Sequence, residues 1–455
     1  MQTRFWILNC LVAIGAIAGA TTAHAQHYVG FRPGYDQPGY GPAQGVAYAA
    51  DQDPNQLDMT GEEGLAPAVN TDTSCTDGAA CGCEECCRWW PDLRPAPGWF
   101  ANVEYNLWWN KTRTVPPLVT TSPVGTSQAL TGVLPGAQTL FGNDKVGDGL
   151  GSGGRLTFGR WLDEYETFAL AGKFWAFRGK DGEFNQTADG TNLAIPFFDA
   201  QLGIENAYQV AFAPAPGVVF ANGSISVQDR LDMLGAEAYA QFLVYDEQFT
   251  RVDLLGGYHT VRLDNSLQET SLLNVVNGGF IGSPPGSSIF IQDTFEGRNQ
   301  FHGGELGLNV THYYDRWAFH MLGKMSVGNM HQTIIIDGNT VVTTPGPTVS
   351  VRDEGLFALG TNQGTYSRDR IAYIPEVNAK VTYWVHPNVN LSLGYTFMYI
   401  NSVVLAGDQI DRQLNLSQTN GGTPVGPNQN RPMFQGFRET DYWVQGINFG
   451  VECKF

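Results

Sequence analysis

The chain is poor in charge and, after its first 25 residues, has no long apolar run. Charged residues make up 15% of the 455 residues, below the quarter that is usual in soluble proteins. No stretch after residue 25 is apolar for eighteen residues, which argues against a membrane-spanning helix. Lysine and arginine number 26 against 44 acidic residues, which gives a net charge of −18. This negative charge argues against a nucleic-acid-binding protein, which would need a basic surface.

Residues 1–25 have the pattern of a secretory signal peptide. Arg4 precedes an apolar core at 5–20, and Ala23-His24-Ala25 matches an A-x-A cleavage site. The core is too short for an anchoring transmembrane helix. We therefore expect the mature chain to begin near Gln26 and to lie outside the cytoplasm.

Period-two alternation is abundant, and its clearest example is the stretch from Thr440 to Phe455. One row of this stretch is apolar except for Gln445, and the other is mostly small or polar. The apolar row is Trp443, Ile447, Phe449, Val451, Cys453 and Phe455. Such a strand has one apolar and one wet face, which favours a transmembrane β-barrel strand with a lipid side and a lumen side. A strand of a soluble β-sandwich is the alternative.

Ten segments alternate and predict an all-β fold, a closed antiparallel transmembrane β-barrel over residues 99–455. The predicted strands are roughly 99–111, 152–162, 167–178, 230–244, 250–263, 299–313, 317–330, 369–385, 389–401 and 439–455. Short turns alternate strictly with long loops of about 35 to 50 residues, as in barrels with short periplasmic turns and long external loops. Closure requires the first and last strands to pair, because a spanning barrel has no free edge.

The segment 26–98 differs in composition from the predicted barrel. It is rich in glycine, proline and acidic residues without periodicity, which predicts a disordered periplasmic segment. Its disulfide candidates are Cys75, Cys81, Cys83, Cys86 and Cys87. An oxidising envelope favours disulfides, and the odd number leaves one cysteine for a bond to another chain. A metal site is the alternative, although only Cys83 and Cys86 have ligand spacing.

Charged residues fall on the rows that would face the lumen. If the more apolar rows face outward, the lumen-facing residues are Glu104, Arg155, Lys173, Glu237, Asp253, Glu305, Lys324, Glu376, Lys380, Glu452 and Lys454. A network of paired charges that fills a narrow barrel is one interpretation, because an unpaired charge away from water is costly. A charged constriction that selects solutes is the other. Ten strands lie between filled eight-stranded and open sixteen-stranded barrels, so both interpretations stay open.

Nothing in the sequence supports catalysis strongly. His259 with Asp264, and His331 with Asp337, are candidate pairs near the external strand ends. No G-x-S-x-G or H-E-x-x-H motif accompanies them. We expect no catalytic residues, no cofactor and no bound metal.

Several stretches carry a family likeness. They are 116–123 (PPLVTTSP), 152–163 (SGGRLTFGRWLD), 394–399 with 407–411, and 440–452. Together they resemble the putative beta-barrel porin-7 family of outer-membrane proteins, over residues of about 110 to 455. The resemblance implies a barrel in the outer membrane.

The predicted function is a porin-like channel for passive diffusion of small hydrophilic solutes. The alternative is a closed structural or surface-interaction barrel whose long loops bind partners. The expected partners are outer-membrane lipid, small hydrophilic solutes, the barrel-assembly machinery through the C-terminal strand, and a disulfide-linked chain through the N-terminal cysteines. A continuous water path would favour the channel, and a packed lumen would favour the closed barrel.

Overall fold

The computed structural model describes residues 98–455, except 279, 347, 419–424 and 427–428. The predicted signal peptide, the N-terminal segment up to residue 97 and its five cysteines lie outside the described residues. Among those described, no helix has the length and apolar character that crossing a membrane would need. Two short 3₁₀ turns, η1 (Gln128–Leu130) and η2 (Gly407–Gln409), are the only helical elements of this part of the chain.

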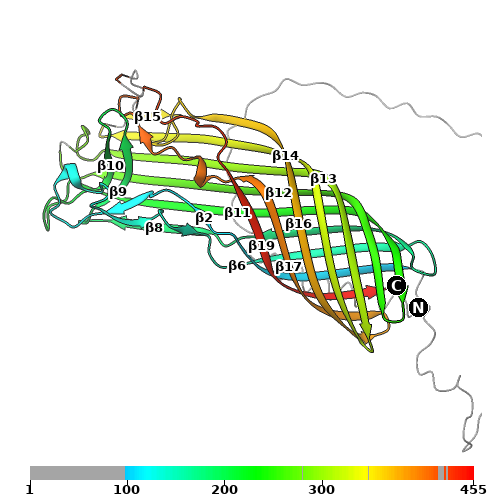
Figure 1. Cartoon of the computed structure of the whole chain (residues 1–455). Coiled ribbons are helices and arrows are strands. Elements are labelled where there is room, and N and C mark those ends of the chain that lie inside the picture. The colour runs from blue at the N-terminus through cyan, green and yellow to red at the C-terminus, as the bar shows by residue number, and fades with distance from the viewer. Residues whose placement is uncertain (1–97, 279, 347, 419–424, 427–428) are drawn as a thin grey trace, which may run out of the picture. The chain divides into compact units, whose positions relative to one another are not determined.

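Ten antiparallel strands form a ring in which each strand pairs with two neighbours (Figure 1). In chain order they are β1 (Trp99–Asn110), β6 (Leu150–Trp161), β7 (Phe168–Arg178), β11 (Ala221–Glu247), β12 (Thr250–Val275), β13 (Ser288–Tyr314), β14 (Trp317–Thr344), β16 (Gly364–His386), β17 (Val389–Val404) and β19 (Glu439–Lys454). The last strand pairs with the first from Phe100↔Lys454 to Asn110↔Val444. The predicted pairing of the two ends is therefore confirmed.

Four strands are about twice as long as the shortest ones. β11, β12, β13 and β14 have 26 to 28 residues, whereas β1, β6 and β7 have 11 or 12. These four strands extend beyond the others at the end away from the short turns, which we call the distal end. We call this extended part of the four strands the half-wall. β8 (Gly182–Ala188) pairs with β11 there, and β15 (Thr348–Arg352) pairs with β14. The sequence prediction made these strands too short at their distal ends, because it followed only the part in which the outward row is apolar.

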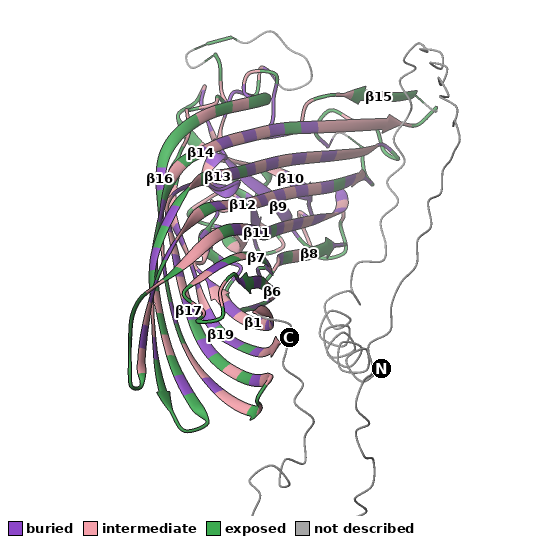
Figure 2. Cartoon of the chain, turned by 90° about the vertical axis from the view of Figure 1, so that its right-hand side faces the viewer, coloured by how far each residue is buried: buried purple, intermediate pink, exposed green. Residues whose placement is uncertain are grey.

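The long connections that were predicted as loops are folded in large part. They contain β2 (Arg113–Thr114), β3 (Val119–Thr121), β4 (Gln138–Phe141), β5 (Lys145–Val146), β9 (Leu193–Asp199), β10 (Ile204–Ala211) and β18 (Gln413–Leu414). Strands β10, β9, β3 and β4 form a second sheet, with β18 beside β9. In Figures 1 and 2, β9 and β10 lie along the half-wall. We call the described residues of 111–149, 189–220, 353–363 and 405–438 the cap.

Side chains alternate between the two faces of the ring strands, as the stripes of Figure 2 show. On β14, Phe319, Met321 and Met325 are exposed, whereas Lys324 and Ser326 between and beside them are buried. The outward rows of all ring strands together form an apolar band. On β12 this band ends where Leu254 and Tyr258 give way to Arg262 and Asp264, which form an ion pair of 2.6 Å on the outer face.

Pairing of β19 with β1 requires a glycine at position 446, because Gly446 lies directly opposite Trp108 of β1. A Cβ there would lie 2.3 Å from the Leu107 carbonyl oxygen and 2.5 Å from the Trp108 Cα, both backbone atoms of the paired strand. We expect Gly446→Ala to cost about 1 to 3 kcal/mol or more and to reduce the folded fraction. The mobility shift between unheated and heated samples on a gel measures this fraction.

The control is Gly323→Ala on β14, where an added Cβ would meet nothing within 4 Å. This variant should fold like the wild type. Equal folded fractions for the two variants would contradict the strand pairing at Gly446.

Candidate functional site

Eight buried polar side chains meet inside the ring, one from each of eight consecutive strands. We call this set the central charge cluster, and it consists of Glu104, Arg155, Lys173, Glu237, His259, Glu305, Lys324 and Glu376. Each of these residues is at most 9% exposed. Alternation alone puts them inside, because each occupies an inward position of its strand.

Lys324 is the hub of the cluster. Its Nζ lies 2.5 Å from Glu237 Oε1, 3.1 Å from Glu376 Oε2 and 3.2 Å from Glu305 Oε2. Lys173 adds a contact of 2.8 Å to Glu237. Each of these carboxylates therefore has a cation within direct reach, as burial of charge requires.

The cluster bridges the full width of the ring. β7 and β16 are five strands apart in either direction, so they face each other across the interior. Lys173 Nζ on β7 nevertheless lies 3.8 Å from Glu376 Oε1 on β16. Arg155 on β6 reaches the same oxygen at 3.9 Å and pairs with Glu104 at 3.0 Å. Side chains from opposite walls thus meet, and the interior is occupied at this height.

The other charged residues that the sequence placed in the lumen lie outside the cluster. Lys380 is at its edge, 4.0 Å from Glu104 and with 18% of its side chain exposed. Asp253 pairs with Arg251 at 2.8 Å, and Lys454 pairs with Glu166 at 3.5 Å. Glu452 is half-buried and has no ion pair among the described residues.

His259 belongs to the cluster, although the sequence suggested it as a rim residue. Its Nδ1 lies 2.8 Å from Ser326 Oγ, and its Nε2 lies 3.6 Å from Glu237. Glu237, His259 and Glu305 hold ligand atoms within 4.8 Å of one another, which is close enough for a metal ion. The Lys324 ammonium, however, already contacts both carboxylates, so the charge that a metal would supply is present.

The histidine–aspartate pairs considered for catalysis do not form. His259 is fully buried, whereas Asp264 pairs with Arg262 on the outer face. His331 lies 3.1 Å from Asp369, not beside Asp337, on the exposed side of β14 and β16.

A continuous apolar layer covers the distal side of the charge cluster. Nine of the ten ring strands contribute to it, and β6 carries glycine at the corresponding inward positions. Its members are Trp108, Trp175, Phe177, Leu231, Met233, Val261, Leu263, Phe301, Met330, Ala372, Ile374, Met398, Ile400, Val403, Leu405, Tyr442 and Val444. Trp108 packs on Trp175 and Phe177 with ring centroids 6.0 and 5.7 Å apart. None of these residues is more than 5% exposed, so the layer fills the ring at this height.

On the distal side of the apolar layer, four inward polar side chains on β11, β12, β13 and β14 bind the segments that cross the interior of the ring, around residue 113 and at 402–406. We call Asp229, Asn265, Asn299 and Gln332 the clamp. Asn299 accepts a hydrogen bond from the Val404 N–H (2.7 Å) and donates one to the Val404 carbonyl (2.9 Å).

The remaining clamp residues act in the same way. Asn265 accepts from the Ala406 N–H at 2.8 Å, Gln332 donates to the Ser402 hydroxyl at 3.2 Å, and Asp229 pairs with Arg113 at 2.6 Å. Two segments that are remote in sequence, around 113 and 402–406, are thereby fixed to one wall.

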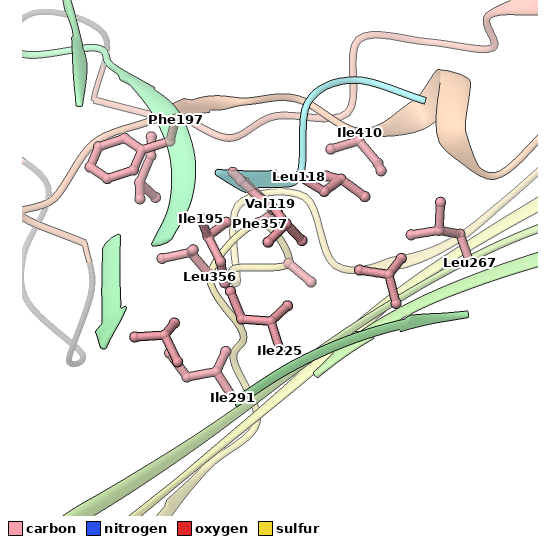
Figure 3. Close-up of a cluster of buried hydrophobic side chains, with 14 of the residues drawn as sticks. Leu118, Val119, Ile195, Phe197, Ile225, Leu267, Ile291, Leu356, Phe357 and Ile410 are labelled. Atoms are coloured by element: carbon pink, nitrogen blue, oxygen red, sulfur yellow. The ribbon is translucent and has the colours of Figure 1, made fainter. Parts of the chain in front are cut away.

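A second apolar core joins the cap to the half-wall (Figure 3). Ile225, Leu267 and Ile291 project from the wall toward Leu118 and Ile195 of the cap, and all five are buried. Burial of apolar surface on this scale contributes about 25 cal/mol per Å², so the cap and the wall form one folded unit.

Two carboxyl groups lie opposite each other in this outer core. Glu269 of β12 pairs in register with Asp293 of β13, beyond the apolar band, and both are at most 3% exposed. Asp293 accepts hydrogen bonds from the backbone N–H groups of Leu356, Phe357 and Ala358 at 2.8 to 3.1 Å, which anchors this segment of the cap.

The apolar surroundings favour the neutral form of both groups. Burial raises the pKa of Asp293 to about 6, although the three backbone donors lower it. Burial, and secondarily the charge of Asp293, raises the pKa of Glu269 well above its ordinary value.

The strand ring, its apolar outer band and its alternating interior define the class of protein as an antiparallel β-barrel. The chain belongs to the family described as putative beta barrel porin-7, whose model matches residues 100–455. The predicted family is therefore confirmed. No curated protein sequence matches the chain.

The chain also aligns with several solved structures. The outer membrane protease OmpT from Escherichia coli has 11% identity and a TM-score of 0.32, over 80% of this chain and 99% of OmpT. A Pseudomonas aeruginosa FadL homologue has 8% identity and a TM-score of 0.21, over 79% and 90% of the two chains. The Pseudomonas putida toluene transporter TodX has 8% identity and a TM-score of 0.19, over 80% and 91%.

Removing the hub cation should destabilise the barrel strongly. Lys324→Met keeps the length of the side chain but leaves Glu237, Glu305 and Glu376 facing one another without their shared ammonium. We expect a loss of about 3 to 5 kcal/mol in the free energy of unfolding, measured with urea in detergent.

Lys380→Met is the matched control. It removes one partly exposed contact of 4.0 Å and should cost on the order of 1 kcal/mol or less. Equal losses for the two variants would show that the cluster does not depend on the Lys324 contacts.

The acid pair predicts that the fold is more stable under mildly acidic conditions. Unfolded carboxyl groups lose their protons near pH 4, whereas folded Asp293 and Glu269 keep theirs to a higher pH. The folded chain then binds more protons, so the free energy of unfolding falls as the pH rises from about 4 through 6 and beyond. Thermal unfolding midpoints at pH 5 and pH 8 measure this decline.

Glu269→Gln should flatten the decline, because the amide carries no titrating proton. Glu296→Gln is the control, since Glu296 pairs with Arg298 on the outer face of β13. If Glu269→Gln retained the full pH dependence of the wild type, the buried pair would not be its source.

Proposed function

We propose that the protein is an outer-membrane β-barrel that is closed in its resting form and acts through its external cap. The proposal combines three properties of the described residues: an apolar outer band, an interior filled from wall to wall, and a cap that is fixed to the half-wall. The filled interior is the observation that carries the proposal.

The outer band supports placement in a membrane. On β1 the outward row runs from Trp99 to Trp109, and eleven residues match the 9 to 11 of a tilted transmembrane strand. Aromatic pairs lie at the short turns, where Trp317 and Tyr383 have ring centroids 4.8 Å apart and Tyr313 and Trp384 6.1 Å. Aromatic girdles of this kind mark the interfaces of outer-membrane barrels.

The interior supports a closed barrel. The contact from Lys173 to Glu376 spans the ring at one height, and the apolar layer fills it at the next. A solute that passed through would have to displace buried ion pairs, then a layer of aromatic and aliphatic side chains, and then the clamp. Such a path is very different from the polar, water-filled lumen of a porin.

Passive diffusion of small hydrophilic solutes is the second candidate function. The family description names a porin, and the charge cluster contains nearly equal numbers of acidic and basic side chains. In this structure, a channel would require the segment 402–406 to leave the clamp and the apolar layer to separate.

Single-channel recording in planar lipid bilayers tests the proposal. We expect the wild-type protein to show no steady conductance. Asn265→Ala combined with Asn299→Ala removes the hydrogen bonds to Val404 and Ala406 and should produce brief openings, because the crossing segment loses its anchors.

Gln268→Ala combined with Gln300→Ala is the matched control, because both residues lie on outward positions of the same two strands. This control should stay silent. A wild-type conductance that is steady and ohmic would overturn the closed barrel and establish the channel.

A further inference from the structure

A cleft opens where the first and last strands of the ring separate. Pairing of β1 with β19 ends at Asn110↔Val444, with one more hydrogen bond from the Lys111 N–H to the Trp443 carbonyl. Beyond this point the segment that follows β1 and the segment that precedes β19 diverge, and the turn η2 lies between them. The resulting cleft has a volume of about 510 Å³, within the range that accommodates small ligands. It lies just past Trp109, at the distal end of the apolar band.

Most charges around the cleft are already paired. Lys111 Nζ contacts Asp441 Oδ1 at 2.6 Å, and Arg113 contacts Asp229 at 2.6 Å. Glu439 is held by Arg368 and by Arg370. These pairs leave little net charge for an ionic ligand to neutralise.

Two charged residues are exceptions, because neither has an ion pair among the described residues: Arg438, which donates hydrogen bonds to Gln435 and to a backbone carbonyl, and Asp408. The Asp408 carboxylate lines the cleft and has no hydrogen bond or ion pair among the described residues, although its backbone carbonyl accepts a hydrogen bond from Arg438 at 3.3 Å. Burial raises the pKa of Asp408, against the opposing charges of Arg438 and Lys111. A half-buried carboxylate of this kind offers strong acceptors to a ligand that brings hydrogen-bond donors.

The surroundings of Asp408 restrict the chemistry of that ligand. A cationic ligand would be repelled by Arg438, and an anionic ligand would be repelled by Asp408. Thr112 and Thr114 supply further hydroxyl groups, whereas the half-buried Pro116 supplies a small apolar surface. An uncharged molecule with many hydroxyl groups and an apolar ring face matches this combination.

We infer that the cleft between β1, η2 and β19 binds an uncharged saccharide, with Asp408 accepting hydrogen bonds from its hydroxyl groups. This inference deepens the proposed function, because it names a ligand class for the external side of the closed barrel. Binding is measured on detergent-solubilised protein, so a failure to bind leaves the conductance test unaffected.

Isothermal titration calorimetry of the full-length protein tests the inference with four probes: glucose, maltose, glucosamine and glucuronate. We expect glucose or maltose to bind more tightly than the cationic glucosamine and the anionic glucuronate. Asp408→Ala should weaken binding by about tenfold or more, as expected for the loss of charge-assisted hydrogen bonds. Because the Asp408 side chain bonds to no described residue, this variant should fold normally.

Asp189→Ala is the matched control, an exposed aspartate of the same external region. It should bind like the wild type. Three outcomes would overturn the inference: no binding of either neutral sugar, equal affinity in Asp408→Ala, or tighter binding of a charged probe. Circular dichroism and gel mobility of Asp408→Ala distinguish lost binding from lost folding.

Discussion

The contacts of Lys324 with three glutamates set the character of this barrel. Glu237, Glu305 and Glu376 come from three different strands and are almost inaccessible to water. Buried carboxylates need cations, and the contacts of Lys324 with Glu237 and of Lys173 with Glu376 join strands that are not neighbours, so they form only if the walls come within the length of two side chains. The ten-stranded ring allows this approach. Its interior therefore becomes a packed core with a polar centre, and the apolar layer and the cap are built on that core.

Much of this arrangement was predictable from alternation. All ten ring strands and the inward position of Glu104, Arg155, Lys173 and Lys324 follow from a period of two residues, whereas the family followed from the likeness of several sequence stretches. Pairing was harder to predict, because which charges meet depends on register and shear, to which periodicity is blind. Lys380 has the same inward parity as Glu376, yet it lies two inward positions nearer the short turn to β17 and stays partly exposed.

The distal half of the molecule was missed for a physical reason. Beyond the apolar band the outward row of β11 to β14 becomes polar, as at Arg262 and Arg298, so the signal of a lipid face disappears. The inward row stays apolar through Leu267, Ile225 and Ile291, because it faces the cap instead of a lumen. In this region the sequence alternates as in a soluble sheet, with polar residues facing outward and apolar residues facing inward. Asn265 and Asn299 could have been noticed as amides within that apolar row.

These features together decide how opening could occur. The charge cluster has partners on eight strands, so separating it would require the whole ring to deform. The clamp and the outer core instead join two units along one wall, and their hydrogen bonds converge on the short segment 402–406. The hydrogen bonds of these buried amides are individually worth about 0.5 to 1.5 kcal/mol. Opening would therefore require the segment 402–406 to leave the clamp, while the apolar core keeps the cap and the half-wall together. Any controlled change would begin there, on the external side, where the cleft beside Asp408 borders the same segment.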